Sequence, residues 1–195
     1  MKPLTLFPVL LAASLASLTS TAHTTPVTYQ IDPAHTFPSF EADHMGISVW
    51  RGKLNKNAGT VVYDKADGSG TVDVTMDLAS IDFGLDALNA WATGDKFFNV
   101  ARNPGAMFKG RFASATGGVP TQLVGDLTLN GQTHPVTLTI NKLKCIPHPM
   151  LKRELCGADA SGVFKRNEFG LTAGKDWGFN MDVQLRIQVE ALAKE

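Results

Sequence analysis

Few residues in this 195-residue chain have both the type and the spacing that enzyme chemistry requires. No serine lies in a GxSxG nucleophile elbow, and no closely spaced histidine or cysteine pair is joined by a carboxylate in a triad or metal-binding pattern. The loose acidic series Asp64, Asp67, Asp73 and Asp77 lacks the ligand spacing and the terminal glutamate of a calcium loop. The sequence therefore predicts no catalytic residue, no metal ligand and a protein that is not an enzyme.

Three polar side chains remain candidates for contact with a ligand. His35 and His44 could donate hydrogen bonds to a ligand oxygen, or serve as the acid–base group in the competing hypothesis of a lipid-modifying enzyme. The alternative is that backbone groups at an end of the barrel satisfy both imidazoles, which is the commoner arrangement. Arg166 could place its guanidinium on a phosphate or carbonyl head group, and the alternative is a salt bridge to a nearby carboxylate such as Glu168.

The N-terminal segment has the pattern of a secretory signal peptide. Lys2 supplies a positive charge, residues 4–18 are mainly apolar, and Ser20-Thr21-Ala22 resembles a cleavage site. We expect residues 1–22 to be removed after about Ala22 and residues 23–195 to form one exported domain. An uncleaved membrane anchor is the weaker alternative, because the apolar run is short and contains a proline and several serines.

Export changes the meaning of the two cysteines, because oxidising compartments favour disulfides. We expect Cys145 and Cys156 to form a bridge that closes a polar loop and contributes about 2 to 3 kcal/mol. The alternative is a redox pair or a metal site with His148. The spacing matches neither CxxC nor a recognisable zinc pattern.

The elements that would position these residues are mainly β-strands. From Phe179 to Ala191, apolar and polar residues alternate without a break, as in a long strand with one buried face. Shorter alternations occupy residues 72–78, 107–113, 123–129 and 136–140, and Asn130-Gly131 predicts a two-residue hairpin turn. We expect two or three more strands between residues 36 and 63, with bends at Gly52 and Gly59.

One stretch departs from the strand period. Leu85, Leu88 and Ala92 have helical spacing and Gly94 follows them, so we expect a short helix near residues 85–93 and a loop after it.

Several short motifs follow one another in order along the chain: YQIDPAHT at 29–36, HMG at 44–46, WRG at 50–52, DKFFNV at 95–100, GDLTLNG at 125–131 and FKR at 164–166. Together they resemble the YceI-like family, and the segment between the cysteines is similar to a proteobacterial subgroup of it. The resemblance implies an all-β fold over residues 23–195, an eight-stranded antiparallel lipocalin-like barrel with a short helix. It also implies a periplasmic carrier that encloses a long amphiphile such as an isoprenoid quinone or a fatty amide.

Burial of an isoprenoid tail would be favourable by about 25 cal/mol per Å² of apolar surface. The residues expected to contact such a ligand are Phe40, His44, Trp50, Phe98, Phe108, Phe112, Leu127, Leu138, Phe164, Arg166, Val183, Leu185 and Ile187. The alternative is that the apolar members of this set fill a solid core, as inward residues of small barrels usually do.

Charge narrows the expected partners. Lys and Arg number 18, as do Asp and Glu, so composition gives no electrostatic support for binding nucleic acid or an anionic membrane. We expect a lipid ligand, no other cofactor and no nucleic acid. The sequence is also compatible with transient contact with a membrane or a membrane redox protein. We expect the protein to be a monomer or a homodimer. An interaction module for such a redox partner is therefore a third hypothesis.

Overall fold

The computed structural model describes residues 25–195, so the expected signal peptide lies outside the described residues. Within this range eleven strands form one antiparallel sheet. They are β1 (Val27–Ile31), β2 (Phe37–His44), β3 (Ser48–Leu54), β4 (Asn57–Tyr63), β5 (Gly70–Asp77), β6 (Ile81–Asp82), β7 (Gly105–Thr116), β8 (Val119–Leu129), β9 (Gln132–Pro147), β10 (Glu154–Lys165) and β11 (Asp182–Ala193). The helical elements are η1 (Leu78–Ser80), α1 (Asp86–Thr93), η2 (Arg166–Phe169) and η3 (Lys175–Trp177).

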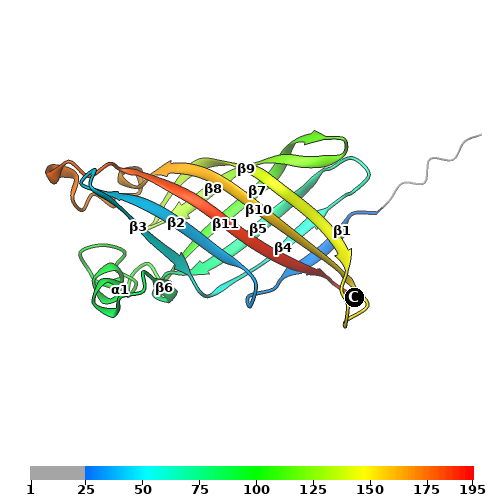
Figure 1. Ribbon diagram of the computed structural model, residues 1–195, viewed down its shortest axis with the longest axis horizontal. Helices are drawn as coiled ribbons and strands as arrows, with labels where there is room; N and C mark the ends of the chain where they lie inside the picture. The colour runs from blue at the N-terminus through cyan, green and yellow to red at the C-terminus, as the bar shows by residue number, and fades with distance from the viewer. Residues whose placement is uncertain (1–24) are drawn as a thin grey trace, which may run out of the picture.

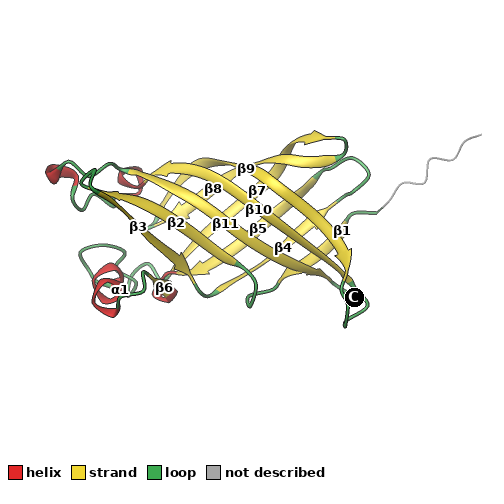
Figure 2. Cartoon of the chain, in the orientation of Figure 1, coloured by secondary structure: helices red, strands yellow, loops and turns green. Residues whose placement is uncertain are grey.

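Six of these strands are halves of three interrupted strands. β11 pairs with β2 through Val183–Gln188 and with β1 through Ala191–Ala193, so β1 and β2 lie end to end. β3 and β4 continue each other beside them, and β6 and β5 do the same one position further. Counted in this way, eight strands follow one another in sequence order and the last pairs with the first. The expected closed eight-stranded barrel is confirmed (Figures 1 and 2).

The alternation of apolar and polar residues along β11 places the apolar ones on the inner wall of the barrel. Val183, Leu185 and Ile187 face the interior, while Gln184 and Arg186 are exposed on the outer surface. The strand begins at Asp182, so the predicted start at Phe179 is three residues too early. Residues 179–181 are irregular instead, and the Phe179 N–H donates to the Gly174 carbonyl at 3.2 Å rather than to a neighbouring strand.

The hairpin between β8 and β9 is confirmed. Asn130 and Gly131 adopt φ values of 51° and 74°, which a tight two-residue turn between antiparallel strands requires. The expected bends at Gly52 and Gly59 are wrong, because both residues lie inside strands. The interruption between β3 and β4 falls at Asn55-Lys56 instead. A Cβ at Gly52 would lie 2.6 Å from Cζ of Phe40, so this glycine makes room for an aromatic ring.

The expected short helix is also confirmed, since α1 runs from Asp86 to Thr93. The loop after it brings Phe97 and Phe98 against the barrel core at the end of the molecule where α1 lies (Figure 1). Among residues 25–195, no helix has the length and apolar character needed to cross a bilayer.

Candidate functional site

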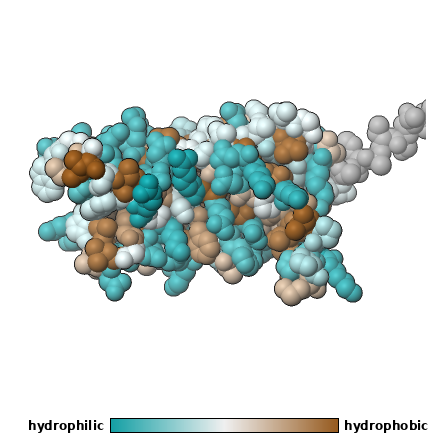
Figure 3. All heavy atoms as spheres, in the orientation of Figure 1, coloured by the Kyte–Doolittle hydropathy of each residue, from teal (hydrophilic) through white to brown (hydrophobic). Residues whose placement is uncertain are grey.

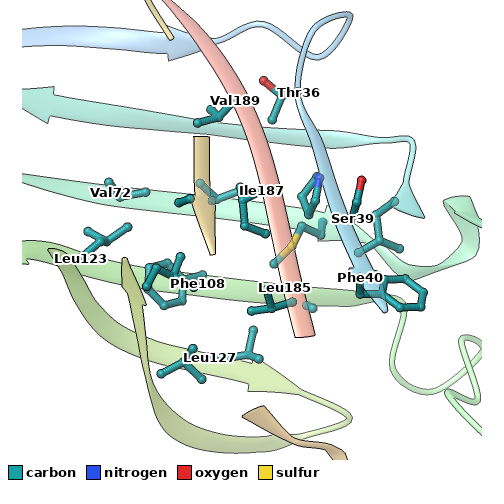
Figure 4. Close-up of a pocket in the computed structure, with 18 of the residues that line it drawn as sticks. Thr36, Ser39, Phe40, Val72, Phe108, Leu123, Leu127, Leu185, Ile187 and Val189 are labelled. Atoms are coloured by element: carbon teal, nitrogen blue, oxygen red, sulfur yellow. The ribbon is translucent and has the colours of Figure 1, made fainter. Parts of the chain in front are cut away.

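The barrel is hollow. Its interior holds a cavity of about 250 Å³, and side chains from strands all around the barrel line it. Figure 4 shows Phe40, Phe108, Leu127 and Leu185 gathered around this space from different strands. The alternative of a core filled completely by its own side chains is therefore not what the structure has.

Most of the residues proposed from the sequence line this cavity. They are Phe40, Phe98, Phe108, Phe112, Leu127, Leu138, Phe164, Arg166, Val183, Leu185 and Ile187. Whether they contact a ligand stays a prediction. Other lining residues were not among those expected to contact a ligand. Val72 and Met76 on β5 are examples, and their alternating pattern could have identified them.

His44 and Trp50 lie outside the cavity. The imidazole of His44 stacks on the indole of Trp50 with ring centroids 4.2 Å apart, and Phe179 meets it edge-on at 5.0 Å. Although His44 shares its parity along β2 with Phe40, it is the last residue of that strand and does not line the cavity. Its neighbours are aromatic rings rather than the space where a ligand would lie.

His35 also lies outside the cavity. Its Nδ1 is 2.7 Å from Oδ2 of Asp32, and this hydrogen bond raises the pKa of the imidazole and lowers that of the carboxyl. Neither histidine is placed to act as an acid or base on a molecule in the cavity.

Arg166 is the only lining residue, within the described part of the chain, whose side chain carries a charge at neutral pH. It is 7% exposed, and this burial lowers the pKa of the guanidinium. Nη1 donates to the Leu171 carbonyl at 2.8 Å and Nη2 to the Ala173 carbonyl at 2.7 Å. The salt bridge to Glu168 that was the alternative is not formed.

The local backbone explains how Arg166 reaches this position. β10 ends at Lys165, so Arg166 is the first residue of η2 rather than a strand residue. The chain then turns back so that the carbonyls of Leu171 and Ala173 face the guanidinium. Backbone dipoles, rather than a carboxylate, satisfy this buried cation.

A second cluster of polar side chains is formed by Tyr29 on β1, Glu154 on β10 and Lys65 after β4. The hydroxyl of Tyr29, a residue 1% exposed, donates to Oε2 of Glu154 at 2.5 Å. Lys65 Nζ lies 2.6 and 2.9 Å from the two oxygens of the same carboxylate. Burial, followed by the bond to Glu154, raises the pKa of Tyr29. Burial alone would raise the pKa of Glu154, but Lys65 and Tyr29 together lower it.

The Cys145–Cys156 disulfide is confirmed. The two residues are direct partners in the β9–β10 ladder, and Cys156 also lines the cavity. A carboxylate oxygen of Glu154 lies within 4.8 Å of both sulfur atoms, which is a spacing that a metal could use. Because both sulfurs are bonded to each other, no thiolate is present there to bind a metal ion.

A closed antiparallel barrel with an apolar interior and one buried cation defines this molecule as a small barrel of the lipocalin-like type. A family model described as a YceI-like domain matches residues 29–191. Protein YceI of Salmonella arizonae and that of Salmonella dublin are each 31% identical over 191 residues, covering 95% of this chain and 98% of the relative. This chain belongs to the YceI-like family.

Solved structures agree on the fold. BcnA of Burkholderia cenocepacia superposes with a TM-score of 0.66 at 23% identity, covering 83% of this chain and 99% of that one. A Campylobacter jejuni YceI protein gives 0.63 at 22% identity, covering 78% and 90%. A polyisoprenoid-binding domain from Saccharophagus degradans gives 0.62 at 16% identity, covering 86% and 99%.

Proposed function

We propose that this chain is a binding protein that holds a long-chain isoprenoid, or a similar amphiphilic lipid, noncovalently for transport, storage or shielding. The observation that carries the proposal is the apolar cavity enclosed by the barrel. An apolar tail buried there leaves water without losing any hydrogen bond, since it has none to lose. The similarity to a domain that binds polyisoprenoids supports this choice of ligand.

Arg166 is the residue we assign to the head group. Two of its five N–H donors are used by the Leu171 and Ala173 carbonyls. The remaining donors could bind a phosphate or quinone oxygen, and the low-polarity surroundings would strengthen that bond.

We propose a binding protein rather than an enzyme, because His35 and His44 lie away from the cavity. We also propose that the protein is exported to the periplasm. The Cys145–Cys156 disulfide supports this, since such bridges persist mainly in oxidising compartments.

The proposal is tested by native mass spectrometry of protein purified from its own periplasm, followed by organic extraction. We expect a bound species of isoprenoid mass. An empty protein that also fails to take up added prenyl lipids would contradict the carrier function, and a redox partner that co-purifies with it would support an interaction module.

The role of Arg166 is tested by comparing a prenyl diphosphate with the corresponding hydrocarbon. We expect Arg166→Met to weaken binding of the diphosphate about tenfold or more, because charge-assisted hydrogen bonds contribute about 1.5 to 3 kcal/mol. Binding of the hydrocarbon should change little. Arg166→Lys keeps the charge and controls for folding, and equal losses for both ligands in Arg166→Met would show that the residue is only structural.

A further inference from the structure

The β9–β10 hairpin projects apolar side chains into solvent. At its tip Met150 is 81% exposed and Leu151 50% exposed, and Ile146 on the approaching strand is 41% exposed. The hairpin lies beside the C-terminus, at the end of the barrel opposite α1 (Figure 1). Figure 3 shows hydrophobic residues at both ends of the molecule on the face in view.

Hydrogen bonds fix the shape of this tip. The His148 N–H donates to the Arg153 carbonyl at 2.7 Å and closes the turn. Inside the turn, Nδ1 of His148 accepts the N–H groups of Met150 and Leu151, each at 3.1 Å. The disulfide ties the two strands together just before the turn. The apolar side chains are therefore presented on a rigid turn.

Basic residues surround the tip. Lys142, Lys144 and Lys152 are exposed, and Arg153 is half-buried. Glu154 is the only acidic residue between positions 142 and 154, and Lys65 neutralises it.

Further along the strands, Asp159 stands opposite Lys142, and Glu190 stands opposite Gly157, the ladder partner of Lys144, so these carboxylates offset part of the positive charge there. Asp32 binds His35, and Glu195 lies 4.0 Å from Arg153. Although the whole chain is neutral, residues 144–153 around the turn contain Lys144, Lys152 and Arg153 and no acidic residue, so positive charge is concentrated at the tip.

We propose that this hairpin docks the protein on an anionic lipid bilayer. Met150, Leu151 and Ile146 would enter the boundary between head groups and acyl chains, while Lys144 and Lys152 remain among the lipid phosphates. This combination of an exposed apolar tip and basic flanks matches an anionic lipid surface in both hydrophobicity and charge.

Docking here would serve cargo exchange. Cys156, Gly157 and Ala158 belong to the same hairpin and line the cavity, so the docked face adjoins one end of the cavity. This role in exchange rests on the proposed function, whereas docking itself rests on the hairpin.

The opposite end of the barrel also exposes large apolar side chains, including Ile47 at 79% and Trp177 at 76%. Acidic and basic residues alternate there, as in Lys175-Asp176, so that end has no comparable excess of positive charge. It therefore provides the matched control.

The experiment is cosedimentation of the protein with vesicles of phosphatidylcholine, with and without phosphatidylglycerol, at low and high salt. We expect binding only to vesicles with phosphatidylglycerol, weakened by salt. Replacing both Met150→Ser and Leu151→Ser should abolish binding, and Lys144→Gln or Lys152→Gln should each weaken it about fivefold. The double variant Ile47→Ser, Trp177→Ser should bind like the unchanged protein.

Equal binding to both kinds of vesicle, no binding at all, or loss only in the Ile47→Ser, Trp177→Ser variant would overturn the proposal. Each variant is also extracted for bound lipid. A hairpin variant that loses docking but retains its lipid supports the proposal and separates docking from cargo binding. Docking by an unchanged protein that yields no extractable lipid would instead contradict the proposed function alone.

Discussion

Glu154 connects three segments that are far apart in the sequence. It belongs to β10, and its carboxylate binds Tyr29 on β1 and Lys65 after β4. Its pKa in the folded protein is below the ordinary value of 4.5. Its charge therefore stabilises the fold above pH 4.5, and this contribution is lost as the pH falls through the lower pKa of the folded state.

We expect Glu154→Gln to lower the free energy of unfolding at neutral pH by about 1 kcal/mol or less, since Lys65 is 47% exposed and solvent screens the pair. The two proteins should converge in stability below pH 4.5. Urea unfolding at a series of pH values measures this, and a difference that stays constant into acid would contradict the assigned sign.

At the residue scale, the sequence predicts cavity residues well and polar contacts poorly. Phe108, Leu127 and Leu185 follow from strand parity, since alternate residues share a face. The Tyr29–Glu154–Lys65 group had no local signal, because only the closed barrel brings these residues together. The position of Arg166 in the wall was anticipated, but its bonds to backbone carbonyls depend on a turn that parity does not reveal.

At the scale of elements, β11 provides a matched pair of substitutions. Leu185 faces the cavity and Gln184 is exposed on the same strand. We expect Leu185→Glu to destabilise the protein by several kcal/mol, or to empty it, because a carboxylate would be placed in an apolar interior. Gln184→Glu should have almost no effect. Thermal unfolding and lipid extraction measure both, and equal tolerance would show that the inner face has been assigned wrongly.

The disulfide is the second prediction at this scale. Cys145 and Cys156 are 11 residues apart, so chain entropy gives their bridge about 3 kcal/mol. We expect replacement of both cysteines by serine to lower the free energy of unfolding by roughly that amount. The same loss should appear when the unchanged protein is reduced. Urea unfolding compares the unchanged protein, the double serine variant and the reduced protein. Equal stability of all three would contradict a structural role for the bridge.

Strand limits were harder to predict than strand existence. The Asn130-Gly131 turn is specified by two residues that accept positive φ, so its position was clear. Gly52 was ambiguous, because a glycine can mark a bend or make room for a neighbour, here the ring of Phe40. β1 had no separate prediction, since its five residues form a strand by pairing with β4 and β11.

For the whole molecule, cavity volume should limit cargo. Ala160 on β10 is 6% exposed and lines the cavity. We expect Ala160→Phe to reduce the bound lipid while leaving the stability of the empty protein unchanged or raised by about 1 kcal/mol, because the ring fills space. Val163→Phe on the exposed face of the same strand is the control. A full complement of lipid in Ala160→Phe would contradict the assignment of this cavity as the binding site.

The pairing of the last strand with the first has a consequence for synthesis. Tyr29 stands opposite Ala193, and the Lys194 N–H donates to the Thr28 carbonyl at 2.8 Å. A nascent chain that has not yet added the 12 residues of β11 is an open sheet with two unpaired edges. Such edges recruit other chains, so this stage needs a chaperone or rapid completion. Premature termination within β11 should therefore yield aggregates rather than a leaky barrel.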